Sequence, residues 1–243
     1  MKRLFKRSLA MGIITGLCAV GASSAMAAAT VCTTIGPNAG SPDITLAVAS
    51  NFYEPGQDIV RVFLGTTAGS GKTVKICHNA SGTLIGEVNA SNNPYHLFLS
   101  ADDVRPGQVS SKIGDQFTYA TGVPALWSKI VVKNDLLTSD KKVNKTKVTS
   151  LAVADPVGAP YGLAAKKVLE GMGQWETSGS WITQYDNIAL TLDAAENGGK
   201  KAAFVSWAQV CGRANLETFP GNAFKQNGIQ VNYGTTTAKQ LAN

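Results

Sequence analysis

Small polar residues follow apolar, strand-like runs at four places in this chain, each time just before a helix-like segment. The four junctions are Ala49-Ser50-Asn51, Ala80-Ser81-Gly82-Thr83, Ala159-Pro160-Tyr161-Gly162 and Asp186-Asn187-Ile188. The first N–H groups of a helix have no intrahelical acceptor, and the helix dipole is positive at that end. A helix start therefore attracts anions, and four of them brought together would form an anion-binding site.

The side chains at these junctions are neutral hydrogen-bond donors. Ser50, Asn51 and Ser81 can each donate to an anion, and Gly82 and Gly162 would let the backbone approach a ligand closely. Such a scheme needs no Arg or Lys, and it favours ligands that carry charge but no proton, such as tetrahedral oxyanions. Taken one at a time, the same residues are also ordinary helix caps.

Motifs for catalysis or nucleotide binding are incomplete. The stretch from Thr66 to Thr73 approaches a phosphate-binding loop, but Thr66 occupies the position where the signature requires glycine. Both histidines, His78 and His96, lie in strand-like runs without a nucleophile-elbow pattern nearby. The pair Asp102-Asp103 suits a helix cap or a turn as well as an acid pair. We therefore predict a surface turn at residues 66–73 and no enzyme.

The N-terminus has the plan of a secretory signal peptide. Four basic residues lie within the first seven positions, an apolar run follows from Leu9 to Val20, and Ala25-Met26-Ala27 ends the segment. We expect residues 1–27 to be removed and the mature chain to be soluble, periplasmic and free of a lipid anchor. No later run reaches the roughly 20 apolar residues of a membrane helix.

Charge and cysteine content narrow the partners further. Four of the 22 basic residues lie in the signal peptide, which leaves 18 against 16 acidic residues and gives little support to nucleic-acid binding. A lysine cluster is predicted to be a solvated loop; its members are Lys141, Lys142, Lys145 and Lys147. Export favours one disulfide among Cys32, Cys77 and Cys211, with the pairing open. His78 beside Cys77 has no second close ligand pair, so no metal and no cofactor are predicted.

The elements that must position the junctions alternate along the chain, which predicts an α/β fold with largely parallel sheet. Residues 28–42 look like an irregular extension, and residues 117–133 look like a crossover between lobes. The predicted strands are Ile44 to Ala49, Thr73 to Cys77, His96 to Leu99, Phe117 to Ala120, Ile130 to Val132, Leu151 to Ala154 and Ala202 to Val205. The predicted helices are Pro55 to Leu64, Thr83 to Asn89, Pro160 to Gly171 and Ile188 to Asn197.

The segment Leu46-Ala47-Val48-Ala49-Ser50-Asn51-Phe52 resembles the opening strand of the molybdate-binding proteins of ABC importers. Three further segments agree in order and spacing, at residues 98–103, 117–128 and 151–162. The resemblance covers roughly residues 44 to 210. It implies a type II periplasmic-binding fold, in which two α/β lobes joined by a hinge close on the ligand. Lobe I would comprise residues 28–118 plus 219–243, and lobe II residues 119–218.

The same resemblance implies a function and a site. The ligand would be molybdate or tungstate, the partner an ABC transporter permease, and the protein a monomer. The implied ligand-binding positions are Ser50, Asn51, Ser81, the N–H of Tyr161 and the backbone near Ile188. They coincide with the four helix starts.

Three departures from the family pattern leave alternatives open. Ser206 stands where some members place a ligand-contacting Tyr, and His78 and Asn79 replace smaller residues, which would alter pocket size or ligand preference. The chain also stops at Asn243, where relatives usually continue through a strand and a helix. One alternative is a binding protein for another small anion such as sulfate, a phosphonate or an organic acid. The other is an exported scaffold that kept the fold and lost transport.

Overall fold

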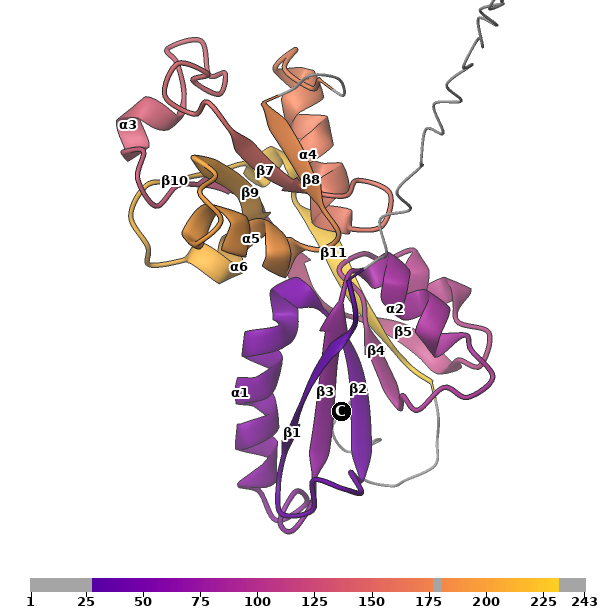
Figure 1. The fold of residues 1–243 in the computed structure, drawn as a ribbon. Helices are drawn as coiled ribbons and strands as arrows, with labels where there is room; N and C mark the ends of the chain where they lie inside the picture. The colour runs from indigo at the N-terminus through magenta and orange to yellow at the C-terminus, as the bar shows by residue number, and fades with distance from the viewer. Residues whose placement is uncertain (1–27, 177–180, 232–243) are drawn as a thin grey trace, which may run out of the picture.

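The protein consists of two α/β lobes, each built around its own sheet (Figure 1). The structure is a computed structural model and describes residues 28–176 and 181–231. The predicted signal peptide, residues 1–27, lies outside the described residues. We use lobe I for the elements of the six-stranded sheet and lobe II for those of the five-stranded sheet.

Lobe I has the strand order β1-β3-β2-β4-β11-β5. Strand β2 is parallel to β3 and β4, and the other neighbours pair antiparallel. The strands are β1 Val31–Ile35, β2 Ile44–Ala49, β3 Val74–Asn79, β4 Leu97–Leu99, β5 Ile113–Gly122 and β11 Phe224–Gln230. The helices are α1 Tyr53–Leu64 and α2 Ser81–Val88, with 3-10 turns at Ser50–Phe52 and Arg105–Gln108.

Lobe II has the strand order β10-β6-β9-β7-β8. Strand β7 is parallel to β8 and β9, and the remaining pairs are antiparallel. The strands are β6 Pro124–Trp127, β7 Leu151–Ala154, β8 Ile182–Tyr185, β9 Ala202–Ser206 and β10 Leu216–Thr218. The helices are α3 Lys133–Leu136, α4 Pro160–Gly171, α5 Ile188–Glu196 and α6 Trp207–Val210, with a 3-10 turn at Pro220–Asn222.

The predicted α/β class is confirmed, and three details of the prediction are wrong. The sheets are only partly parallel: the lobe I sheet is parallel at β3-β2-β4, the lobe II sheet is parallel from β9 to its edge strand β8, and the other pairs are antiparallel. Residues 130–132 form a bend before α3, and the strand of that region is β6. Residues 28–42 contain β1, whose β-branched residues form an antiparallel edge beside β3.

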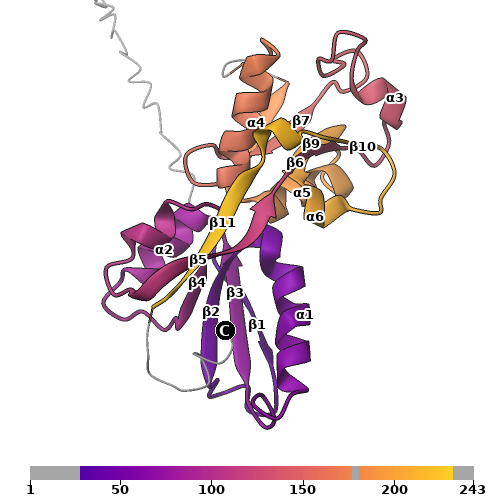
Figure 2. The same cartoon turned by 180° about the vertical axis from the view of Figure 1, so that it is seen from behind.

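Two neighbouring strands join the lobes (Figure 2). Strand β5 runs to Gly122, only Val123 separates it from β6, and β11 pairs with it as far as the Phe224–Gly122 register. Both strands leave the lobe I sheet side by side. This pair of extended segments contains the crossover between lobes predicted for residues 117–133, and a strand from near the end of the described chain completes it.

A disulfide ties the edge strand to the lobe I sheet. Cys32 on β1 lies opposite Cys77 on β3 in the antiparallel register, and their sulfur atoms are bonded. Cys211 is exposed and has a free thiol. The structure thus answers the pairing that the sequence left open, and it takes Cys77 away from any metal. Within the described ranges, no helix is long and apolar enough to cross a membrane.

Candidate functional site

The four helix starts meet at one small cavity between the lobes. All five predicted site residues line it: Ser50, Asn51, Ser81, Tyr161 and Ile188. Its volume is about 10 Å³. Sites for drug-sized organic ligands occupy roughly 300 Å³ or more. The cavity as formed therefore suits a single small group and excludes a larger organic solute.

Lobe I contributes side-chain donors at the ends of two buried parallel strands. Ser50 and Asn51 follow β2 directly, and Ser81 is the first residue of α2. These three residues are 6%, 3% and 1% exposed. The Ser81 Oγ accepts a hydrogen bond from the Ala101 N–H at 2.9 Å. Because that bond uses only a lone pair, the Ser81 hydroxyl proton remains for another acceptor.

Lobe II contributes backbone donors at the starts of α4 and α5. Pro160 opens α4 and has no N–H, so the first N–H of that helix belongs to Tyr161. At α5, the Asn187 Oδ1 accepts from the N–H groups of Ala189 and Leu190, both at 3.0 Å. This cap leaves the Ile188 N–H, which has no acceptor within its own helix.

No charged side chain lines the cavity, as far as the described residues show. The closest acidic group on lobe I, Asp102, is occupied by an ion pair with Arg105 and by the N–H groups of Val104 and Arg105. Asp102 is therefore the turn cap that its sequence allowed. An anion in the cavity would meet neutral donors and helix dipoles only, without a counter-ion.

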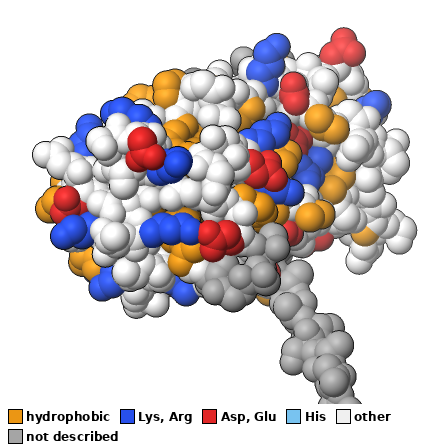
Figure 3. Space-filling model, turned by 90° about the horizontal axis from the view of Figure 1, so that it is seen from above, with side chains coloured by type: hydrophobic (Ala, Val, Ile, Leu, Met, Phe, Trp, Pro, Cys, Tyr) orange, Lys and Arg blue, Asp and Glu red, His pale blue; other side chains and the backbone are white. Residues whose placement is uncertain are grey.

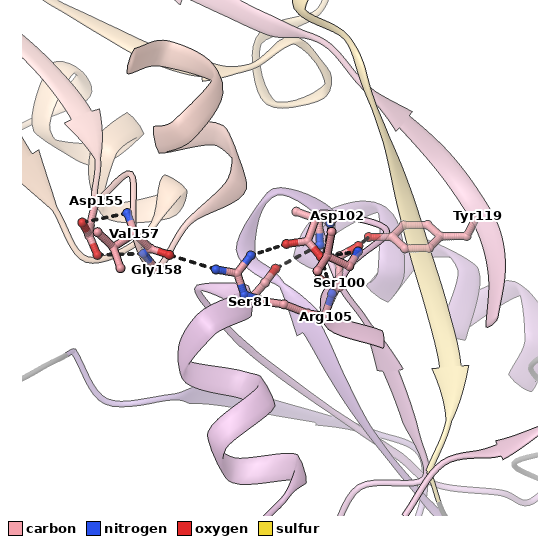
Figure 4. A network of polar contacts seen from close by, with 10 residues as sticks. Ser81, Ser100, Asp102, Arg105, Tyr119, Asp155, Val157 and Gly158 are labelled. Carbon is pink, nitrogen blue, oxygen red and sulfur yellow. Dashed lines mark hydrogen bonds and ion pairs between the residues drawn. The ribbon is translucent and has the colours of Figure 1, made fainter. Parts of the chain in front are cut away.

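Hydrogen bonds around the cavity connect the lobes directly, among them the following three. The Gly82 N–H donates to the Gly158 carbonyl at 2.9 Å, and the Asn187 Nδ2 donates to the Asn79 Oδ1 at 3.2 Å. Figure 4 shows the third, in which Arg105 Nη2 reaches across to the Val157 carbonyl at 2.9 Å. The lobes are thus in contact, as in the closed form of a hinged binding protein.

Asn79 lines the cavity, and the sequence predicted for it only an effect on pocket size or ligand preference. It is 1% exposed, and its Oδ1 accepts from the Ala80 N–H at 2.8 Å as well as from Asn187. Its Nδ2 donates to the Ala28 carbonyl at 2.8 Å. Asn79 therefore positions the start of α2 and joins the two lobes. The sequence signal that could have indicated this role is a polar residue at the end of a buried strand.

His78 supports Ser50 from the neighbouring strand. Its Nδ1 lies 3.0 Å from the Ser50 Oγ, and its ring stacks on Tyr53 with 4.0 Å between the ring centres. Burial lowers the pKa of His78. Burial also lowers the pKa of His96, although a hydrogen bond with the Thr45 backbone opposes the shift. Both rings are therefore held in the neutral form near pH 7.

We expect the ligand-free protein to lose stability as the pH falls from 7.5 to 5.5. The pKa of both histidines is lower in the folded state than in the unfolded chain, where it is about 6.5. The unfolded chain therefore binds protons first, and stability present above pH 6.5 declines below it. Urea unfolding at several pH values measures the effect.

The variant His78→Asn places an amide near the Nδ1 position and cannot titrate, so it should reduce this pH dependence. The carboxylates of Asp43 and Asp140 have a lowered pKa and act only in more acidic solution, below about pH 4. Equal stability of the wild-type protein at pH 5.5 and 7.5 would contradict the prediction.

The Tyr161 hydroxyl is engaged by neighbouring side chains, which leaves the Tyr161 N–H as the donor for the site. Its hydroxyl oxygen accepts from the Ser206 Oγ at 2.8 Å, and Ser206 in turn caps α6. Burial raises the pKa of Tyr161 to about 12, so the phenol keeps its proton. Ser206, the departure noted in the sequence, thus supports a helix start instead of lining the cavity.

The chemistry of the surroundings argues for binding. Within residues 28–176 and 181–231, no three His, Cys, Asp or Glu side chains form a group that would hold a metal ion. The stretch from Thr66 to Thr73 forms turns at the far end of α1, as predicted, and does not reach the cavity. The arrangement is a cradle of hydrogen-bond donors between the two lobes.

Comparisons with known proteins agree with this architecture. The family model for bacterial extracellular solute-binding proteins matches residues 44–238. The molybdate-binding protein ModA of Rhodobacter capsulatus is 34% identical over 180 residues, covering 72% of this chain and 68% of the relative. ModA of Azotobacter vinelandii is 31% identical over 176 residues, covering 71% and 68%.

Solved structures show the same fold. The periplasmic molybdate-binding protein of Azotobacter vinelandii superposes with a TM-score of 0.72 at 24% identity, covering 82% of this chain and 90% of that structure. The sulfate-binding protein SubI of Mycobacterium tuberculosis gives a TM-score of 0.58 at 15% identity, covering 83% and 80%. The predicted two-lobed fold is confirmed, and the chain belongs to the family of bacterial extracellular solute-binding proteins.

Proposed function

We propose that this protein captures a tetrahedral oxyanion, molybdate or tungstate, and delivers it to an ABC importer. The relatives that share about a third of its residues are named as molybdate-binding proteins. The observation that carries the proposal is the cavity itself. It joins Ser50, Asn51 and Ser81 of one lobe to two helix N-termini of the other, and none of its lining side chains is charged.

Donors of this kind select the ligand by charge and protonation. A fully deprotonated oxyanion accepts hydrogen bonds at every oxygen, so it can be held by neutral N–H and O–H groups alone. A carboxylate would favour a bidentate Arg, and none lines the cavity. Sulfate needs the same hydrogen-bond donors as molybdate, so the lining residues do not distinguish the two ions. We choose molybdate because the relatives are named as molybdate-binding proteins.

The protein binds its ligand without chemical change, and the oxyanion is cargo, not a cofactor. The Ser50 hydroxyl does contact an imidazole, but we assign His78 a positioning role, because His78 lies outside the cavity lining and its ring packs on Tyr53. We propose no nucleic-acid partner. On the face shown in Figure 3, basic and acidic side chains are interspersed and form no continuous basic surface.

Capture and release follow from the hinge. Lobe I would hold the ion first through its side-chain donors. Lobe II would then rotate about β5 and β11 and add the Tyr161 and Ile188 N–H groups. Closure is driven by contacts that exist only in the closed state. After removal of the signal peptide, the protein acts as a periplasmic monomer that docks on a transporter permease.

Thermal unfolding of residues 28–243 with 1 mM oxyanion tests the proposal. A ligand that binds only the folded state at micromolar Kd stabilises it by about 4 kcal/mol at that concentration. The midpoint should therefore rise by several degrees with molybdate and tungstate. Sulfate, phosphate and chromate are the comparison ions.

The variant Ser81→Ala should lose most of this shift, because a hydrogen bond to a charged group is removed. Ser91→Ala, in the exposed loop after α2, is the matched control and should keep it. A shift with sulfate alone would assign the site to another anion. No shift with any oxyanion would overturn the transport function and favour the exported scaffold.

A further inference from the structure

Asn51 has a buried amide atom without a partner beside the proposed oxyanion. As placed, its Nδ2 donates to the Gln226 Oε1 at 2.9 Å, and its Oδ1 is buried with no hydrogen-bond partner among the described residues. A carbonyl oxygen left in this position would repel an anion. The two ends of a terminal amide have nearly the same shape, so their identity follows from the hydrogen-bond network around them.

Tyr119 decides the direction of that network. Its hydroxyl lies 2.8 Å from the Ser100 carbonyl and 3.1 Å from the Gln226 amide oxygen. A backbone carbonyl can only accept, so the single Tyr119 proton goes to Ser100. The Tyr119 oxygen must then accept from Gln226, which requires the Gln226 NH₂ group to stand where its oxygen is placed.

Tyr161 gives the same answer from the other end of the Gln226 side chain. Its hydroxyl lies 3.0 Å from the Gln226 amide nitrogen and already accepts from Ser206. The Ser206 oxygen accepts from a backbone N–H in its capping box, and its own proton points to Tyr161. If both Ser206 and the Gln226 amide nitrogen donate to the Tyr161 oxygen, the Tyr161 proton has no acceptor. Turning the Gln226 amide supplies one.

We infer that Gln226 determines specificity by turning the Asn51 amide so that its NH₂ group faces the cavity. The turned Gln226 donates to both Tyr119 and Asn51, and the Asn51 Oδ1 accepts, which leaves the Asn51 Nδ2 toward the ligand. Every buried group of this network then has a partner except the one donor reserved for the anion. This inference rests on the proposed function, and it assigns a positioning role to a residue on the hinge strand β11.

The result is a cavity in which the Asn51 amide presents a donor and not an acceptor to the ligand. A proton-bearing anion, such as hydrogenphosphate, needs an acceptor for its proton, and the turned Asn51 amide no longer supplies one. Molybdate, tungstate and sulfate need none. Gly122, on the partner hinge strand, leaves room for this network, since a Cβ there would lie 2.7 Å from the Gln226 amide and 2.8 Å from the Tyr161 hydroxyl.

The variant Gln226→Met tests the role, because methionine has nearly the shape of glutamine and lacks the amide that donates and accepts hydrogen bonds. Calorimetry should show about tenfold weaker molybdate binding and unchanged or stronger phosphate binding, so that the ratio of the two affinities falls. Tyr119→Phe should change the ratio in the same direction. Gln230→Met, on the same strand, is the control and should leave it unchanged.

A purely structural role would weaken both anions together, and that result would overturn the inference. A readout without ligand separates its failure from failure of the proposed function. In the ligand-free protein, nuclear Overhauser contacts should connect the Gln226 NH₂ protons with the Tyr119 ring. Contacts with the Tyr161 ring instead would overturn the inference even if molybdate binds.

Discussion

Replacing Gly82 with valine is expected to weaken molybdate binding more than about 100-fold while the ligand-free protein stays folded. A Cβ at this position would lie 2.8 Å from the Gly158 carbonyl oxygen and 3.0 Å from the Gly158 Cα in the closed form. Both are backbone atoms of the opposite lobe and cannot rotate aside. Overpacking typically costs about 1 to 3 kcal/mol for added methylenes, and each 1.4 kcal/mol is a tenfold change in affinity.

The cost falls on closure because Gly82 and Gly158 approach each other only when the lobes meet. Gly86→Val is the matched control: it lies in the same helix, where valine has a higher helix propensity than glycine, and a Cβ there would meet no atom within 4 Å. Calorimetry with molybdate on both variants measures the difference. Equal affinities would show that the lobes do not close as tightly as this structure indicates.

Removing the disulfide is expected to lower the free energy of unfolding by about 4 kcal/mol. Cys32 and Cys77 are 45 residues apart, and a cross-link of that span restricts the unfolded chain by roughly this amount in the chain-entropy model. The double variant Cys32→Ala/Cys77→Ala, compared with the oxidised wild-type protein by guanidinium unfolding, gives the value directly.

Cys211→Ala is the control, because an exposed free thiol should change stability by no more than about 0.5 kcal/mol. A loss below about 1 kcal/mol in the double variant would mean that strand pairing alone holds β1 on the sheet. The variant also bears on the site, since the chain just before β1 accepts hydrogen bonds from Asn79 through the Ala28 carbonyl and the Thr30 hydroxyl.

Local signals were enough to locate the helix starts. The bounds of β2 and α4 were predicted to the residue, because an uninterrupted apolar run identifies the strand and Pro160 and Gly171 mark the ends of the helix. The edges were harder. Strands β1, β10 and β11 were not among the predicted strands, because they pair with distant segments of the chain and short strands carry little periodicity.

By itself, the sequence determined which residues could donate to an anion, since helix starts and neutral side chains are properties of a few consecutive residues. Only the tertiary structure decided that these donors share one cavity, that Cys32 pairs with Cys77, and that Gln226 contacts Asn51. The last contact spans 175 residues. Nothing local encodes such a distance, because it is set by the return of β11 to the first lobe and by the packing of the two lobes against each other.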